Sequence, residues 1–408
     1  TEILTNCSTL VSCETGAVKP PLSYVIKTKK RLGGIAVFLR PTRMEVNLAN
    51  IQSNFKTIWQ HVGAGPQIMA VVKADAYGHG AVEVAKSLIE GGCQRFAVAT
   101  PDEAVTLREA GINDPILVLG PSPYDAASAY VKYDISAALT DAVFAQIMSR
   151  EAVNQGKTAM LHLKIDTGMG RIGFLPDQVP DIIDDILKLP GIKIEGLFTH
   201  FATADEKRLD YTNQQFARYM KVYHFLESKG VRIPLRHVCN SAAVLNSPEK
   251  HLDAVRPGII LYGMYPSSEC IRPIELKPTF EVKTAIAAVK EISSNSGVGY
   301  GLRYMSRGTE RIAVLPIGYG DGFSRCLSMK VPVLVHGKRV SMVGNICMDQ
   351  TMIDVTDIED VKVGDEVVII GRQGEEVITP EEIAPARGTI NYEIPIMFSK
   401  RVPRVYIR

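Results

Sequence analysis

The side chains that could carry chemistry in this chain stand where short apolar segments end. Lys73 closes one such segment, and Lys164 and Asp166 close another. Amines, carboxylates, imidazoles and guanidinium groups at such positions can move protons or hold anions. Other apolar segments are followed by further polar residues and one glycine: His200, Asn240, Ser241, Arg256 and Gly258.

Lys73 is the most informative of these residues. Desolvation at the end of a buried strand lowers the pKa of a lysine, and a neutral amine is what a Schiff base requires. This favours Lys73 as the covalent anchor of a carbonyl cofactor. The alternative is an ordinary lysine at a strand end that reaches solvent.

The segments that carry these residues alternate with stretches of helical period, which is typical of a parallel α/β fold. Eight strands close a barrel, so we expect a (β/α)8 TIM-like barrel; an open doubly wound sheet is the alternative. Catalytic groups of a barrel lie at the carboxyl ends of its strands, and phosphate sites favour the last two loops, where Ser241 and Gly258 fall. The predicted strands cover residues 67–73, 95–100, 115–120, 135–140, 159–166, 194–200, 235–240 and 254–258.

Helices are predicted between these strands, for example at 81–90 with Gly91 as its stop and at 102–110 with Asp102 as its N-cap. Trp59 follows Phe55 at helical spacing, so we expect it in the core.

The chain divides into three predicted parts. Residues 1–40 show no clear period and are expected to be a poorly ordered leader, and residues 41–275 form the barrel. From 276 to 408 the helical periods vanish, which predicts a C-terminal, mainly-β domain. Its predicted strands cover residues 284–289, 311–317, 331–335, 351–355 and 366–370.

Composition excludes several classes of protein. The 408 residues carry a net charge of +2, so neither nucleic acid nor an acidic surface is indicated as a partner. No run of eighteen apolar residues predicts a membrane span, and no pair of histidines or cysteines has the spacing of a metal site. Seven scattered cysteines are typical of reduced thiols, which favours a cytoplasmic protein.

A long motif and a series of shorter ones then identify a family resemblance. The segment Ala70-Val71-Val72-Lys73-Ala74-Asp75-Ala76-Tyr77-Gly78-His79-Gly80 resembles the pyridoxal-phosphate signature of alanine racemases. The similarity runs from about Pro41 to Arg408, with its blocks in the family's order. Further matching blocks begin at Lys164, Thr199, Asn240, Arg256, Gly299, Gly318, Ile346 and Ile390.

The resemblance implies a barrel with a C-terminal β domain, assembled as a homodimer whose active sites take residues from both chains. It implies pyridoxal 5'-phosphate as the cofactor, anchored on Lys73, with Arg256 facing the pyridine nitrogen and His200 beside the ring. Arg171 would steady the substrate, while Tyr300, Tyr319 and Met348 would come from the partner chain. The other residues expected at the cofactor are Tyr77, Asn240, Ser241, Gly258, Ile259 and Tyr392.

Racemisation needs a proton acceptor and a proton donor on opposite faces of the substrate, which two positioned groups supply economically. We expect Lys73 on one face and Tyr300 on the other. Arginine can only donate, so Arg256 would leave the pyridine nitrogen unprotonated and limit side transamination. Lys164 lies close to Arg171 in this scheme; a carbamate on Lys164 would relieve their repulsion, and an ion pair with Asp166 is the alternative.

The expected function is therefore interconversion of L-alanine and D-alanine, which supplies D-alanine for cell-wall peptidoglycan. A serine or broad-specificity racemase on the same frame is an alternative. A related decarboxylase is less consistent, because no catalytic cysteine or glycine-rich phosphate segment is apparent. A non-catalytic cofactor carrier would explain Lys73 but not some 130 residues of β domain.

Overall fold

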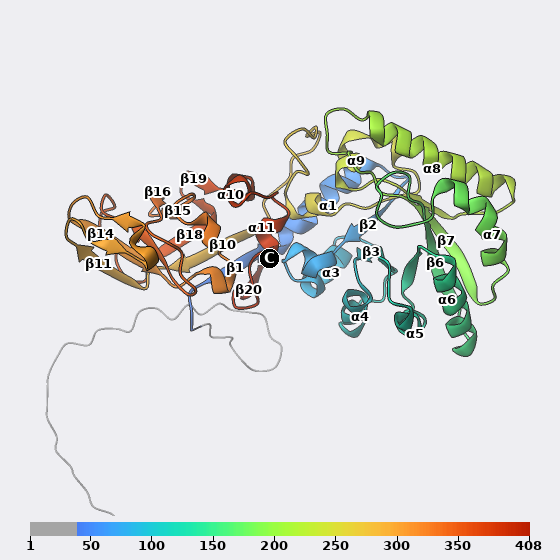
Figure 1. Ribbon diagram of the computed structural model, residues 1–408, viewed down its shortest axis with the longest axis horizontal. Coiled ribbons are helices and arrows are strands. Elements are labelled where there is room, and N and C mark those ends of the chain that lie inside the picture. The colour runs from blue at the N-terminus through green and yellow to red at the C-terminus, as the bar shows by residue number, and fades with distance from the viewer. Residues whose placement is uncertain (1–38) are drawn as a thin grey trace, which may run out of the picture. The chain divides into compact units, whose positions relative to one another are not determined.

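The computed structural model of the protein describes residues 39–408 (Figure 1). The predicted leader lies outside the described residues, apart from its last two. Residues 42–408 form one unit of mutually contacting elements, and all that follows concerns this unit.

Eight parallel strands form one sheet, as the sequence predicts. Each strand lies on one of the predicted segments, although β7 begins two residues early. In spatial order the strands are β8 (Leu235–His237), β7 (Ile192–Phe198), β6 (Ala159–Lys164), β5 (Ser136–Leu139), β4 (Ile116–Val118), β3 (Arg95–Val98), β2 (Gln67–Val71) and β9 (Ala254–Val255).

The sheet curls until its first and last strands meet. The Asp253 amide donates to the Arg236 carbonyl at 3.1 Å, and the Arg256 amide donates to the Cys239 carbonyl at 2.9 Å. These bonds join the β8 and β9 segments, so the arrangement is a near-closed barrel and not an open doubly wound sheet. The carboxyl ends of all eight strands therefore face one mouth.

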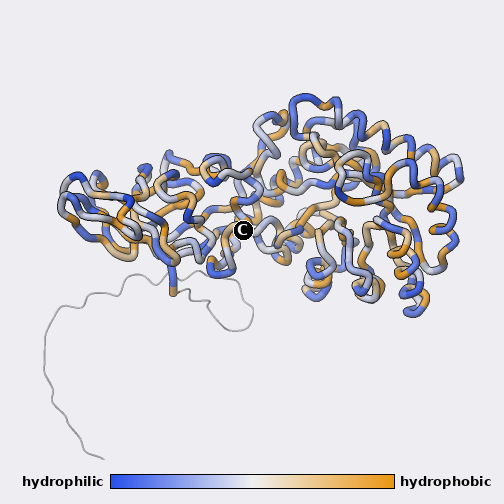
Figure 2. The backbone as a smooth tube through the Cα atoms, viewed as in Figure 1, coloured by the Kyte–Doolittle hydropathy of each residue, from blue (hydrophilic) through white to orange (hydrophobic). Residues whose placement is uncertain are grey.

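Helices follow the strands around the outside of the barrel (Figure 1), and in Figure 2 they alternate between hydrophilic and hydrophobic residues along their length, as surface helices do. The helical segments, of which α2 has left-handed backbone angles, are α1 (Leu48–Val62), α2 (Lys73–Tyr77), α3 (Ala81–Glu90), α4 (Pro101–Glu109), α5 (Ala127–Lys132), α6 (Ala142–Asn154), α7 (Val179–Leu187), α8 (Asp210–Ser228) and α9 (Ser241–Asn246). Short 3₁₀ turns are η1 (Tyr124–Ala126), η2 (Pro176–Gln178), η3 (Pro248–Lys250) and η4 (Ile259–Tyr262).

Two details of these helices differ from the sequence analysis. The N-cap of α4 is Thr100 and not Asp102, because Pro101 occupies the first helical position and Thr100 forms a reciprocal capping box with Glu103. Trp59 is 55% exposed, whereas Phe55 is buried. The prediction that Trp59 lies in the core is wrong, because the buried stripe of α1 passes through Phe55 and Ile58 and leaves Trp59 outside it.

The second group of strands is the mainly-β part of the chain. A seven-stranded sheet contains β16 (Lys338–Ser341), β15 (Pro332–Val335), β18 (Glu366–Gln373), β10 (Phe280–Ala285), β1 (Arg43–Asn47) and β20 (Arg404–Ile407) in this order, with β19 (Glu376–Ile378) paired to β18. Smaller sheets join β11 (Ala288–Ile292), β14 (Glu310–Leu315) and β17 (Thr351–Asp354), and β12 (Gly297–Val298) with β13 (Tyr304–Met305).

Strand β1 is the main difference in organisation. Residues 43–47 fall within the predicted barrel segment, but they pair antiparallel with β10 and parallel with β20. The predicted strand at 284–289 is likewise wrong, because it spans the break between β10 and β11. The region also contains helices that the sequence analysis missed, namely α10 (Pro380–Arg387) and α11 (Glu393–Ile396), and the turns η5 (Tyr300–Leu302), η6 (Tyr319–Asp321) and η7 (Arg325–Leu327).

A turn at His336 and Gly337 separates β15 from β16. Both residues have positive φ, 50° and 74°, and they join β15 to β16 in a tight antiparallel hairpin. Among residues 39–408 no helix has the length and apolar character that crossing a bilayer requires.

Candidate active site

A left-handed turn directly after β2 presents Lys73 and Tyr77 at the barrel mouth. From Ala74 to Tyr77 four consecutive residues have φ between 51° and 54°, a conformation that costs energy for residues with a Cβ. Backbone bonds of 2.9 Å from Ala76 to Val72 and from Gly78 to Ala74 close the turn. Such strain is typical of functional sites.

Polar side chains from other elements stabilise this left-handed turn through hydrogen bonds. Glu103 accepts a hydrogen bond from the Ala74 amide at 2.6 Å while its other oxygen accepts from the Ala99 amide at 2.8 Å. Arg404, on the last strand of the β sheet, donates to the Gly78 carbonyl at 2.9 Å. Glu103 and Arg404 cannot be recognised from the sequence, because their partners are backbone atoms far away in the chain.

The Lys73 amine lies among other cations. Burial and the nearby charges of Arg171 and Arg256 lower its pKa, while Glu103 acts in the opposite direction. Burial, followed by the charge of Arg256, lowers the pKa of Lys164 to about 7. A lowered pKa makes the neutral, nucleophilic amine available near neutral pH.

Lys164 has no ion pair with Asp166 in the described part of the chain. Its Nζ donates to the Ile165 carbonyl at 2.9 Å. The Asp166 carboxylate instead accepts the amides of the loop that follows, including those of Gly168 at 2.9 Å and Arg171 at 2.8 Å. Asp166 therefore shapes the loop that carries Arg171, and its charge acts on the Lys164 amine only at a distance, because no carboxylate among residues 39–408 lies within ion-pair distance of that amine.

Arg256 is buried at the end of β9, and four of its five N–H groups face the protein. Nη1 donates to the carbonyl of His237 at 2.7 Å and to its Nδ1 at 2.9 Å. Nη2 donates to the carbonyls of Thr199 at 2.8 Å and Val238 at 3.0 Å, and its distance to His200 Nδ1 is 3.5 Å. Within residues 39–408 the Nε–H has no hydrogen-bond partner, so it remains free to bind a ligand.

His200 lies in the same cluster of positive charges. Desolvation and the charges of Arg256, Arg171 and both lysines lower its pKa well below the ordinary value. The ring is therefore neutral near pH 7. A neutral imidazole can pack beside an aromatic ring without adding another cation to the site.

A second set of groups forms a cradle for an anion beside this cluster. A Cβ added at Gly258 would lie 2.5 Å from Tyr77 Oη, so the glycine lets the hydroxyl approach the backbone. Ser241 Oγ accepts the Gly258 amide at 2.7 Å. The ring of Tyr392 lies 6.3 Å from that of Tyr77.

Several hydrogen-bond donors of this cradle are available to a ligand. The Ile259 amide and the hydroxyls of Tyr77 and Tyr392 have no partner in the part of the chain that the structure describes. Burial raises the pKa of both tyrosines, so their hydroxyls stay protonated. The Asn240 side chain accepts the Ala243 amide at 3.0 Å, so it caps α9 and fixes Ser241 at the helix start.

These groups fit pyridoxal 5'-phosphate. The Lys73 amine with its lowered pKa, the free Nε–H of Arg256 and the uncharged donors of the cradle match its aldehyde, pyridine nitrogen and phosphate in kind.

Tyr300, Tyr319 and Met348 do not meet Lys73 within the chain. They belong to the β domain and are 73%, 42% and 53% exposed. Their loops are tied together, however: the Tyr319 amide donates to the Cys347 carbonyl at 3.0 Å, and Asn345 Nδ2 donates to the Tyr300 carbonyl at 2.7 Å.

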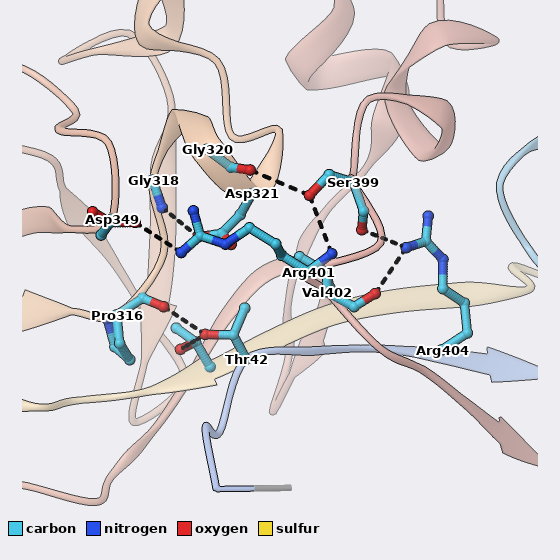
Figure 3. Close-up of polar contacts among 11 residues, drawn as sticks. Thr42, Pro316, Gly318, Gly320, Asp321, Asp349, Ser399, Arg401, Val402 and Arg404 are labelled. Atoms are coloured by element: carbon cyan, nitrogen blue, oxygen red, sulfur yellow. Dashed lines mark hydrogen bonds and ion pairs between the residues drawn. The ribbon is translucent and has the colours of Figure 1, made fainter.

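Arg401 links two of these loops through its ion pairs (Figure 3). It pairs with Asp349 at 2.7 Å and with the buried Asp321 at 3.3 Å, so it joins the loop of Met348 to the turn of Tyr319. Hydrogen bonds and ion pairs therefore connect the loops that carry these three exposed side chains.

Comparison with known proteins agrees with this geometry. Family models described as "Alanine racemase, N-terminal domain" and "Alanine racemase, C-terminal domain" match residues 46–266 and 279–406. "Alanine racemase 2" of Caldanaerobacter subterraneus subsp. tengcongensis is 47% identical over 370 residues, 90% of this chain and 95% of that protein.

Solved structures give the same result. An alanine racemase of Clostridium difficile 630 superposes with a TM-score of 0.86 at 44% identity, covering 91% of this chain and 96% of that one. A histidine racemase of Leuconostoc mesenteroides subsp. sake superposes with a TM-score of 0.84 at 31% identity, covering 91% and 99%.

Proposed function

This chain belongs to the alanine racemase family, and we propose that it interconverts L-alanine and D-alanine with pyridoxal 5'-phosphate held at the barrel mouth. The observation that carries the proposal is the Lys73 amine, whose pKa is lowered within a cluster of cations, beside a cradle of uncharged donors. A carrier protein would need the anchor and the cradle, but it would not need the loops that present Tyr300.

The cofactor supplies, when bound, a conjugated electron-withdrawing ring that makes the substrate's Cα proton removable. Lys73 would anchor it, Arg256 would offer Nε–H to its ring nitrogen, and His200 would lie beside the ring. Tyr77, Ser241, the amides at Gly258 and Ile259, and Tyr392 would hold the phosphate, with Asn240 acting through the cap of α9.

The chain's own groups then move the proton. Lys73 Nζ, whose pKa is lowered by burial and by the neighbouring arginines, accepts or returns the proton on one face of the amino acid. The phenol of Tyr300 does the same on the other face. Arg171 would steady the substrate carboxylate, and Met348 and Tyr319 would limit the space for the side chain to a methyl group.

We propose that Tyr300, Tyr319 and Met348 reach the site from a second copy of the chain. Their exposure and their distance from Lys73 in sequence and in domain support a homodimer with shared sites. The proposal includes a cytoplasmic location and D-alanine supply for peptidoglycan, the role expected of the family. It also includes a carbamate on Lys164, supported by the lowered pKa and the absence of an Asp166 ion pair among the described residues.

Three measurements test the proposal. The purified protein, incubated with pyridoxal 5'-phosphate, should gain a visible absorption band that borohydride removes, with the label on the peptide containing Lys73. In deuterated water, L-alanine should lose its Cα proton and become racemic. The same assay with serine, lysine and histidine decides the substrate; faster turnover of any of them would overturn the alanine assignment, and retained Cα protons would indicate a carrier.

A further inference from the structure

A line of polar side chains crosses the barrel interior beneath Arg256. His237 on β8 contacts Arg256 through Nδ1, and its Nε2 lies 2.8 Å from Nδ1 of His162 on β6. Nε2 of His162 lies 3.3 Å from a carboxylate oxygen of Glu195 on β7. Both histidines are buried, and the side chain of Glu195 is only 16% exposed.

The chemistry of the two ends fixes the direction of every hydrogen bond in this line. Arginine can only donate, so Nδ1 of His237 must accept, and its proton must lie on Nε2. That Nε2–H donates to Nδ1 of His162, whose own proton must then lie on Nε2 and point at Glu195. An ionised carboxylate can only accept, so both ends require the same pair of neutral Nε2–H tautomers.

Glu195 is built to remain the anionic end. Hydrogen bonding to His162, together with the charge and hydrogen bond of Arg95, lowers the pKa of the carboxyl well below its ordinary value despite its partial burial. Arg95 Nη1 and Ser136 Oγ each donate to it at 3.3 Å.

The backbone makes room for this line of hydrogen bonds from Glu195 through His162 and His237 to Arg256, which we call the relay. Gly196 has no positive φ that would require a glycine, yet a Cβ there would collide with the imidazole of His162. The glycine therefore serves the placement of the His162 ring. The register of β6 and β7 brings His162 opposite Gly196, so the ring lies next to the position without a side chain.

Arg256 needs this support, because within residues 39–408 no carboxylate lies within ion-pair distance of its guanidinium. Its partners are carbonyls and neutral rings, and burial lowers its pKa to about 10. A buried cation without a counter-charge is costly.

We propose that Glu195, acting through His162 and His237, positions the Arg256 guanidinium at the barrel mouth and supplies the negative charge that balances it. Glu195, His162 and His237 are thus positioning residues, since none touches the substrate. The relay itself follows from the geometry, whereas its effect on turnover rests on the proposed function.

The first test needs neither cofactor nor activity. Nitrogen NMR of the apoprotein labelled with ¹⁵N-histidine, assigned with His162→Gln and His237→Gln, reports the tautomers. We expect neutral Nε2–H rings at both positions across neutral pH. An Nδ1–H tautomer or a doubly protonated ring at either position would overturn the relay.

The second test uses the holoenzyme and three variants. Glu195→Gln removes the charge at nearly constant shape, and Gly196→Ala displaces the His162 ring while every relay side chain remains. Each should lower kcat on the order of tenfold, as for loss of a charge-assisted hydrogen bond, with the KM for alanine nearly unchanged. Ser136→Ala, which removes a bond to the same carboxylate but leaves its charge, should keep wild-type kcat.

The outcomes distinguish failure of the relay from failure of the proposed function. If the wild-type protein racemises alanine while Glu195→Gln and Gly196→Ala retain its kcat, or if both change only KM, the inference is wrong. If the wild-type protein does not racemise alanine, the proposed function is wrong and the tautomers alone decide the relay. Should both variants fail to fold, the wild-type NMR measurement still decides it.

Discussion

Replacing Gly258 with alanine tests the anion cradle most directly. The added Cβ would lie 2.5 Å from Tyr77 Oη, whereas ordinary contact begins at 3.4 Å, so the hydroxyl must move by 3.4 − 2.5, or about 0.9 Å. The ring cannot swing aside freely, because only 7% of Tyr77 is exposed and its centroid lies 4.9 Å from that of Tyr262. Tight packing transmits such a displacement.

A shift of this size lengthens an O–H···O hydrogen bond from about 2.7 Å to about 3.6 Å, beyond the hydrogen-bonding range. Losing one hydrogen bond to a charged group costs about 1.5–3 kcal/mol. Gly258→Ala should therefore weaken the binding of pyridoxal 5'-phosphate roughly tenfold to a hundredfold, since 1.36 kcal/mol corresponds to a factor of about ten.

Equilibrium dialysis of the apoprotein against pyridoxal 5'-phosphate measures this effect. Gly65→Ala is the matched control, because a Cβ at Gly65 meets nothing within 4 Å and its φ is not positive. Pyridoxal, which lacks the phosphate, should bind Gly258→Ala and wild type equally. Equal loss of affinity for both compounds would refute the assignment of this cradle to the phosphate, as would an unchanged affinity for the phosphate ester.

Three further predictions concern the charged and proton-transfer groups. Folding lowers the pKa of Lys164 from 10.5 to about 7, so in bicarbonate-free buffer the unfolded state holds one more proton than the folded state between these pH values. The free energy of unfolding should therefore rise with pH in this range. Denaturant titrations of Lys164→Met should show a smaller rise, and an equal dependence of the unfolding free energy on pH would contradict the shift. Tyr300→Phe and Lys73→Ala should each lower kcat by about 10²–10⁴, but mixing the two inactive proteins should restore activity through one intact shared site, and a mixture without activity would argue against sharing. Arg256→Glu should raise transamination relative to racemisation, as product analysis by chromatography would show; unchanged partitioning would reject the role given to Arg256.

The sequence predicted the barrel well because its signals are local. Each buried parallel strand is a short apolar run, and the polar residue that ends it is visible without knowledge of the fold. Lys73, Ser241 and Arg256 were found in this way, and the family resemblance added Tyr77 and Tyr392. Helix α3 was predicted at its observed bounds, since its apolar period and its glycine stop coincide.

The features that the sequence did not predict depend on contacts between distant parts of the chain. Residues 43–47 have the composition of any short strand, and only their pairing with residues near 282 and 405 shows which sheet they join. The left-handed turn at 74–77 contains no glycine, so no residue type announced it. Glu195 resembles a surface carboxylate until His162 and Arg95 are found beside it.

The position of β1 has a consequence for biosynthesis. Its neighbours in the sheet are made some 240 and 360 residues later, since Met44 pairs with Val282 and with Arg404. While the ribosome completes the barrel, this strand leaves two hydrogen-bonding edges unpaired, which is a risk for aggregation. Strand β20, made some 360 residues after β1, closes one of these edges, so removal of residues 404–407 would leave β1 open to pairing with other molecules.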